Sequence, residues 1–168
     1  MKRRYLPFLF IVLFSLDMAR CQTKSYKEKL ESLYNHTVPV ILSQNLVDNL
    51  KKENPVVLLD IRSTEEYEIS HLKGALMIDY DDFNNNDIKD IPLDAQVVVY
   101  CSVGYRSEKI GEKLLELGFK DVKNLYGGIF QWKNEGFEVV NNNLQKTDSV
   151  HTYSKSWSKW LENGVKVY

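Results

Sequence analysis

Long apolar runs, a surplus of one charge and a set of paired cysteines are all missing from this sequence of 168 residues. Lys and Arg number 22 against 23 for Asp and Glu, which leaves a net charge of −1. Proteins that bind nucleic acids usually carry an excess of basic side chains, so we expect no nucleic-acid partner. The 3 histidines are scattered and share no ligand spacing with a cysteine. We therefore expect neither a metal nor a cofactor.

The apolar stretch near the N-terminus is too short to span a membrane. Residues 6–16 are almost wholly apolar, whereas a membrane-spanning helix needs about 20 such residues. A basic start followed by a run of this length is typical of a secretory signal, and a buried N-terminal helix is the alternative. Cys21 resembles the lipidated cysteine of bacterial lipoproteins, although Arg20 stands where a small residue is expected.

The chain is therefore expected to be exported, either to the periplasm or to the membrane surface of a bacterial cell envelope. Residues 1–21 would form the signal, and a lipidated Cys21 would attach the protein to the membrane. After it we expect a polar tether with a short helix at 22–37, one domain at 38–140, and a C-terminal loop with an amphipathic helix at 141–168.

Short apolar runs alternate with helical patterns through the predicted domain. Alternation of this kind predicts an α/β fold in which a parallel β-sheet carries helices on both faces. Ser43 is the predicted N-cap of one helix, and Ser63 or Thr64 that of the next. Strands are predicted at 38–41, 56–60, 75–78, 96–100 and 122–125, and helices at 43–51, 65–70, 106–117 and 127–134.

Cys101 follows the clearest strand directly. Ligands of parallel sheets bind beyond the carboxyl ends of the strands, and this places Cys101 where chemistry is expected. If Cys21 is lipidated, Cys101 is the only thiol of the mature chain, and a lone thiol in an exported protein is a candidate reactive group. The alternative is a buried cysteine that acts as a small apolar side chain.

The six residues from Cys101 to Arg106, which we call the Cys101 loop, connect this strand to the next helix. Gly104 lets the chain curl without a Cβ clash, and a tight loop can turn successive N–H groups inward as an anion-binding nest. The N-terminus of the helix and the guanidinium of Arg106 add positive charge. Each of these features stabilises a thiolate, which is the nucleophilic form of cysteine.

Four segments together resemble the single-domain rhodaneses over about residues 38–140. The match consists of four motifs in the order and spacing of that family. The motifs are residues 56–62 with Glu66-Tyr67, the segment His71-Leu72-Lys73-Gly74-Ala75, residues 97–101 with Gly104 and Arg106, and Tyr126-Gly127-Gly128 with Trp132. The resemblance implies the three-layer rhodanese-like fold.

The resemblance also implies a sulfurtransferase. In that family the cysteine takes sulfane sulfur from a small anionic donor such as thiosulfate and passes it, through a persulfide, to cyanide, a thiol or a protein thiol. Cys101 would have the catalytic role, and the donor would be bound by the rest of the loop, namely Ser102, Val103, Gly104, Tyr105 and Arg106.

Two other functions stay open at this point. A non-catalytic rhodanese-like binding module is one, although inactive relatives typically lose the cysteine. A cysteine-based phosphatase or arsenate reductase is the other, but such enzymes place five residues between Cys and Arg, whereas four separate Cys101 from Arg106 here. The shorter loop makes a narrower cradle than a phosphoryl group needs.

The remaining motif residues are interpreted as structural. Asp60 and Arg62 are expected to form hydrogen bonds that brace the loops around the site, and His71 to be a turn residue rather than a general base. Gly127 and Gly128 would allow close backbone packing.

The C-terminal tail is not explained by the resemblance. Its apolar residues fall on one face at helical spacing, which predicts an amphipathic helix packed on the domain. The alternative is a lid or a docking surface near Cys101. The residues concerned are Val150, Tyr153, Trp157, Trp160 and Leu161.

Overall fold

The computed structural model describes residues 26–52 and 56–168. The chain divides into two units, one up to Leu33 and the other from Tyr34 to Tyr168. Within the first unit, residues 26–31 are helical, inside the span for which a short helix is predicted. The predicted signal at 1–21, with Cys21, lies outside the described residues. No helix in the described part of the chain is long and apolar enough to cross a membrane.

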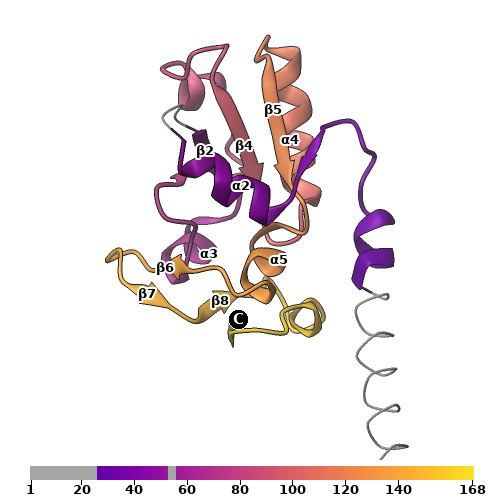
Figure 1. Cartoon of the computed structure of the whole chain (residues 1–168), viewed down its shortest axis with the longest axis vertical. Helices are drawn as coiled ribbons and strands as arrows, with labels where there is room; N and C mark the ends of the chain where they lie inside the picture. The colour runs from indigo at the N-terminus through magenta and orange to yellow at the C-terminus, as the bar shows by residue number, and fades with distance from the viewer. Residues whose placement is uncertain (1–25, 53–55) are drawn as a thin grey trace, which may run out of the picture. The chain divides into compact units, whose positions relative to one another are not determined.

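A five-stranded parallel sheet runs through the second unit and confirms the predicted α/β fold (Figure 1). The order across the sheet is β1-β5-β4-β2-β3. Strands β2 and β4 are the best matched pair, since Val56 to Asp60 align with Gln96 to Tyr100 over their whole length. The strands are β1 (Val40–Ile41), β2 (Val56–Asp60), β3 (Leu76–Met77), β4 (Gln96–Tyr100) and β5 (Asp121–Leu125).

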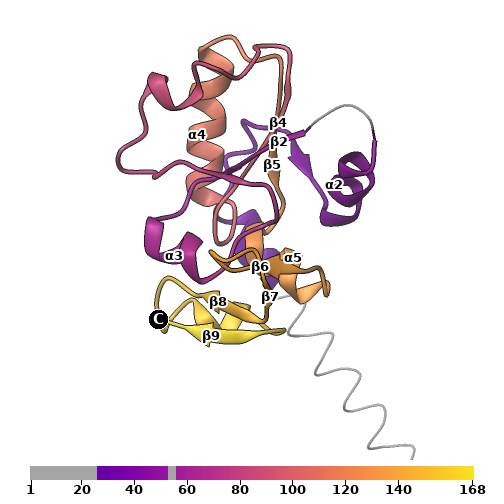
Figure 2. The same ribbon diagram turned by 90° about the vertical axis from the view of Figure 1, so that its left-hand side faces the viewer.

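Helices cover both faces of the sheet. Seen along the sheet, α4 (Tyr105–Glu116) lies on one side and α2 (Ser43–Leu50) on the other (Figure 2). Strand β4 is therefore buried on both faces, which explains its run of β-branched residues: Val97, Val98 and Val99 are all fully buried. Ile110 and Leu114 of α4 close the core on their side.

Two short helices lie at the carboxyl end of the strands, where a site is expected. α3 (Thr64–Ile69) follows β2, and α5 (Gly128–Asn134) follows β5 (Figure 1). Ser63 caps α3 as predicted, because its hydroxyl accepts from the Glu66 N–H while the Glu66 carboxylate accepts from the Ser63 N–H. A 3-10 helix at Asn85–Ile88 lies in the connection between β3 and β4.

The predicted amphipathic helix of the tail is wrong. The segment instead forms a parallel ribbon of β8 (Ser149–His151) and β9 (Val165–Val167), with a 3-10 turn at Ser158–Trp160 between them. Hydroxyl side chains explain the difference, because Thr152 and Ser158 donate to backbone carbonyls and so compete with helical hydrogen bonds. A smaller antiparallel pair, β6 (Val139–Val140) and β7 (Lys146–Thr147), precedes the ribbon.

The prediction that Ser43 caps α2 is wrong by one position. Leu42 is the N-cap, and its carbonyl accepts the N–H of Leu46. Ser43 is the first helical residue, and its buried hydroxyl has no hydrogen-bond partner among the described residues. The cap preference of serine is overridden because the chain must leave β1 in extended geometry up to Leu42.

Candidate active site

Cys101 occupies the turn between β4 and α4, as predicted. It is a free thiol, and only 2% of its surface is exposed. Ser102, Val103 and Gly104 are also buried, whereas the Tyr105 side chain is 45% exposed. The sulfur is therefore enclosed within a largely buried loop.

Gly104 brings one of these backbone groups to the sulfur. Its φ of 100° is in the left-handed region, and from there its N–H donates to Sγ of Cys101 at 3.2 Å. Gly104 is also the N-cap of α4, a helix of 12 residues. The N–H groups that open this helix, including those of Tyr105 and Arg106, have no partner within it. The sulfur thus lies beside the positive end of a helix dipole.

The first two carbonyl groups of the loop are bonded to α5. The N–H of Ile129 donates to the Cys101 carbonyl at 2.9 Å, and the N–H of Phe130 donates to the Ser102 carbonyl at 3.1 Å. Gly128 makes this approach possible, since a Cβ at that position would lie 2.2 Å from the Cys101 carbonyl oxygen. The expected role of this glycine in close backbone packing is therefore confirmed.

Tyr34, which is far from the Cys101 loop in sequence, is hydrogen-bonded to it. Its buried hydroxyl donates to the Val103 carbonyl at 2.7 Å and accepts from the Gly127 N–H at 2.8 Å. Burial raises the pKa of Tyr34 well above its ordinary value, in spite of the hydrogen bond from Gly127, so the phenol stays protonated and remains a donor. The space it fills is the space a Cβ on Gly104 would need, because that atom would lie 2.1 Å from the hydroxyl oxygen.

Asn124 completes the support beneath the loop. Its buried side-chain amide donates to the Gly104 carbonyl at 2.8 Å and accepts from the hydroxyl of Ser107 at 2.8 Å. Strand β5 is thereby connected both to the loop and to the first turn of α4.

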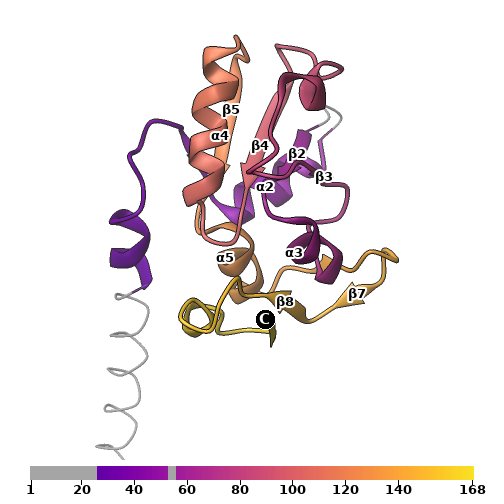
Figure 3. The ribbon, with the colours of Figure 1, turned by 180° about the vertical axis from the view of Figure 1, so that it is seen from behind.

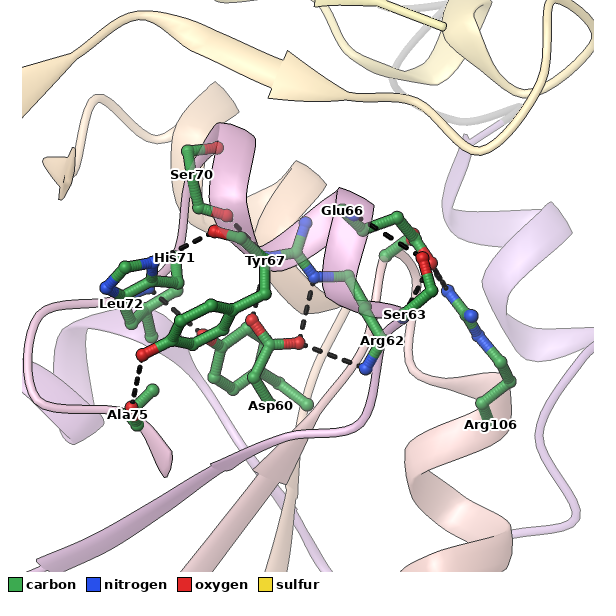
Figure 4. Close-up of polar contacts among 12 residues, drawn as sticks. Asp60, Arg62, Ser63, Glu66, Tyr67, Ser70, His71, Leu72, Ala75 and Arg106 are labelled. Carbon is green, nitrogen blue, oxygen red and sulfur yellow. Dashed lines mark hydrogen bonds and ion pairs between the residues drawn. The ribbon is translucent and has the colours of Figure 1, made fainter. Parts of the chain in front are cut away.

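Arg106 is held by an ion pair with Glu66 of α3 (Figure 4). Its Nη2 donates to both carboxylate oxygens at 2.9 Å and to the Ser102 hydroxyl at 3.2 Å, and that hydroxyl donates to Glu66 at 2.7 Å. Burial opposes the charge on Arg106, but its electrostatic interactions with Cys101 and Glu66 outweigh burial and raise the pKa of the guanidinium. Burial alone would raise the pKa of Glu66. The positive charges of Arg106 and Arg62 outweigh burial, so the pKa of Glu66 is lowered.

Asp60 and Arg62 form a second, wholly buried ion pair (Figure 4). Nε of Arg62 donates to Asp60 at 2.9 Å, and Nη2 donates to it at 2.7 Å and to the Ser70 carbonyl at 2.5 Å. These bonds tie the end of β2 to the end of α3. The predicted bracing of the loops around Cys101 stays a prediction, because these bonds join β2 to α3 and none of them reaches the Cys101 loop.

His71 is buried and packs against Tyr67 of α3. Its ring stacks on Tyr67 at 3.8 Å, and Nδ1 is 3.0 Å from the Tyr67 carbonyl oxygen. Its backbone forms a bridge to Val140. This placement agrees with the predicted structural role. No group of three or more His, Cys, Asp or Glu side chains that could hold a metal occurs between residues 26 and 168, residues 53–55 aside.

Sequence reasoning overlooked Tyr34, Asn124 and the bond from Glu66 to Arg106. Tyr34 and Asn124 act through contacts that are remote in the sequence, for which a single sequence has no signal. For Glu66 the sequence did hold a signal, since a glutamate three residues after Ser63 marks a capping box. The sequence did not indicate that Glu66 also pairs with Arg106 of α4.

Solved structures with this fold include a rhodanese-related protein from Thermoplasma volcanium. It has a TM-score of 0.54 and 27% identity, and the match covers 61% of this chain and 97% of that one. A thiosulfate sulfurtransferase from Pseudomonas aeruginosa has a TM-score of 0.57 at 23% identity, covering 62% of this chain and 20% of that one. At that identity the likeness shows the fold alone.

Curated relatives correct the predicted reaction. A tRNA uridine(34) hydroxylase of Cytophaga hutchinsonii is 38% identical over 87 residues, which are 49% of this chain and 28% of that protein. One of Streptococcus pyogenes is 40% identical over 82 residues, 46% of this chain and 25% of that protein. The chain thus spans about a quarter of the length of these relatives. Because they are named for tRNA hydroxylation, the prediction of a sulfurtransferase that moves sulfur from thiosulfate to a thiol or cyanide is wrong.

The family itself is the one that the motifs suggested. The model of the rhodanese-like domain matches residues 43–135, more than half of the chain. The matched span includes both ion pairs, the whole Cys101 loop and α5, and the relatives that share it are enzymes. The chain therefore belongs to the rhodanese-like domain family.

Proposed function

We propose that this chain is a cysteine-dependent enzyme in which Sγ of Cys101 is the nucleophile. The observation that carries the proposal is the hydrogen bond of 3.2 Å from the Gly104 N–H to this sulfur, at the N-terminus of α4. Donors and a helix dipole aimed at a sulfur atom stabilise its negative charge, and a thiolate is the reactive form of cysteine. A cysteine that only fills space needs none of these groups.

The surroundings of the loop support this proposal. Two of its carbonyls are bonded to α5, and the Tyr34 hydroxyl holds a third, so the electronegative side of the loop is turned away from the sulfur. Arg106 adds a guanidinium beside the loop, where its ion pair with Glu66 offsets part of its positive charge and fixes its position. The Cys101 loop is thus arranged to bind negative charge.

The candidate reaction is the modification of a tRNA uridine, because relatives 38–40% identical carry that activity in their names. The net charge of −1 gives the chain little positive charge for holding RNA phosphates. We therefore expect weak binding of tRNA with a shallow dependence on salt, because few phosphates would be neutralised. Export of the chain from the cytoplasm is the proposal that competes with a tRNA substrate, because an exported chain would not meet tRNA.

The first experiment measures the second-order rate of Cys101 alkylation by iodoacetamide, from pH 5 to 9, on the full chain. Peptide mass spectrometry separates Cys101 from Cys21. Glutathione, as a free thiol, and the unfolded chain are the references. We expect Cys101 of the folded chain to react at lower pH than either. A folded protein whose Cys101 reacts no faster than in the unfolded chain would contradict the proposal.

The second experiment tests the candidate reaction. Cells that lack the gene are complemented with the wild type, with Cys101→Ser, or with Leu144→Ala as a control at an exposed position of the tail, and their tRNA is digested to nucleosides. Gain of one oxygen on uridine with the wild type and Leu144→Ala, but not with Cys101→Ser, would support a tRNA substrate. Unmodified tRNA together with a processed N-terminus found outside the cytoplasm would exclude it.

A further inference from the structure

Tyr153 contacts the Cys101 loop from the C-terminal ribbon, a part of the chain outside the matched family span. Its ring centre lies 5.3 Å from the guanidinium carbon of Arg106, a distance at which a cation and an aromatic ring attract. The ring is otherwise 60% exposed. The contact therefore covers one side of Arg106 while Glu66 binds it from α3.

The backbone of Tyr153 is bent toward this position. Its φ of 62° lies in the left-handed region, which residues other than glycine rarely adopt. The N–H of Tyr153 donates to Nδ1 of His151, and the adjacent Thr152 is bonded to Val167 by its N–H and its hydroxyl. The conformation is therefore set by bonds on both sides of the ribbon.

The ribbon itself is anchored to the elements that frame the site. Strand β8 lies against α3, as Figures 1 and 3 show. Asn134, at the end of α5, donates to the Trp160 carbonyl and accepts from the N–H groups of Glu162 and Asn163. Lys133 of α5 pairs with Asp148 at 2.6 Å. The helices that support Glu66 and the loop carbonyls thus also support the segment that carries Tyr153.

We propose that Tyr153 is a positioning residue, which keeps the Arg106 guanidinium turned toward the Cys101 loop and makes the C-terminal ribbon a part of the active site. This inference rests on the proposed role of Cys101 as the nucleophile. Without the ring, Arg106 keeps its bond to Glu66 but gains freedom to turn toward solvent, and the thiolate loses part of its stabilising charge.

Among the residues that the structure describes, three side chains contact the Arg106 guanidinium: Glu66 of α3, Ser102 of the loop and Tyr153 of the ribbon. Cys101 and Arg62 act on its charge without a contact that is described above. Of these three described contacts, the ring of Tyr153 is the exposed one, so it can be changed without unpairing a buried charge.

The test compares Tyr153→Ala, Tyr153→Leu and Tyr153→Phe by the pH profile of Cys101 alkylation in the full chain, with Tyr168→Ala as the control. Tyr168 is equally exposed, at 59%. We expect the Ala and Leu variants to react about two- to fivefold more slowly at neutral pH, the range that a cation–π contact supports, and to reach half of their maximal rate at higher pH. The Phe variant keeps an aromatic face and should match the wild type.

A double-mutant cycle with Arg106→Ala separates positioning from a general effect on the fold. If Tyr153 acts through Arg106, Tyr153→Ala changes nothing further once Arg106 is absent. Wild-type rates in both Tyr153→Ala and Tyr153→Leu would overturn the proposal, and so would faster rates, which would mean that the ring shields the sulfur. A wild-type Cys101 no more reactive than in the unfolded chain would instead contradict the proposed function itself.

Discussion

Gly104→Ala is the substitution whose cost can be worked out most fully from the structure. With φ at 100°, the new side chain is strained by about 1–2 kcal/mol. Its Cβ would also lie 2.1 Å from the Tyr34 hydroxyl oxygen and 2.7 Å from the adjoining ring carbon. Tyr34 must therefore move, and its two buried hydrogen bonds are lost at about 1 kcal/mol each. The expected total loss of unfolding free energy is about 3–4 kcal/mol.

Gly74→Ala is the matched control. Gly74 has a similar φ of 83°, but a Cβ there meets nothing within 4 Å. This variant carries the backbone strain alone, about 1–2 kcal/mol, and both variants lower the entropy of the unfolded chain alike. The difference between them, about 2 kcal/mol, isolates the displacement of Tyr34.

Urea unfolding followed by tryptophan fluorescence measures both losses. With a slope of about 2 kcal/mol per molar urea, a difference of about 2 kcal/mol separates the two midpoints by about 1 M. Tyr34→Phe already lacks the hydrogen bonds, so in that background Gly104→Ala should cost about 2 kcal/mol less than in the wild type. Equal losses of unfolding free energy for Gly104→Ala and Gly74→Ala would refute the reasoning, because they would show that the Tyr34 side chain moves aside without a cost in stability.

Three further predictions concern the groups around the loop. Asp60→Asn leaves the guanidinium of Arg62 buried without a matching charge and should destabilise the fold by about 3–5 kcal/mol in urea unfolding; a loss below about 1 kcal/mol would contradict a dry ion pair. The pKa of Glu66 is lowered from 4.5, so its stabilising effect is present above pH 4.5 and is lost as the pH falls through the lower folded value. Glu66→Gln should flatten the acid limb of a stability–pH curve, and an unchanged limb would be evidence against the ion pair with Arg106. Asn124→Ala removes a buried donor to the loop and should cost about 1–3 kcal/mol, with slower alkylation of the site thiol as a second readout.

The sheet could be predicted because burial on both faces leaves a mark in the sequence. The uninterrupted Val97-Val98-Val99 of β4 has no other simple explanation, and Cys101 follows it at the end where parallel sheets bind their ligands. Gly104 was also readable, since only glycine adopts its φ without strain. These features are local, and local patterns carry over from sequence to structure.

The supports of the loop were not readable, because they join segments that only the fold brings together. Nothing in the sequence around Tyr34 indicates that its hydroxyl bonds Val103 and Gly127. In the tail, the helical spacing of Val150 and Leu161 was misleading. Both are fully buried, but one lies in a strand and the other follows a 3-10 turn, so the same burial arises without the helix that the spacing predicted.

The bonds from α5 to the loop have a consequence for how the site forms during synthesis. The Cys101 and Ser102 carbonyls are held by Ile129 and Phe130, which leave the ribosome only after β4 and α4 are complete. A nascent chain that ends before α5 therefore carries the thiol in a loop with unpaired carbonyls. The Cys101 loop therefore has its full set of backbone hydrogen bonds only in a chain that extends through α5 and has docked it.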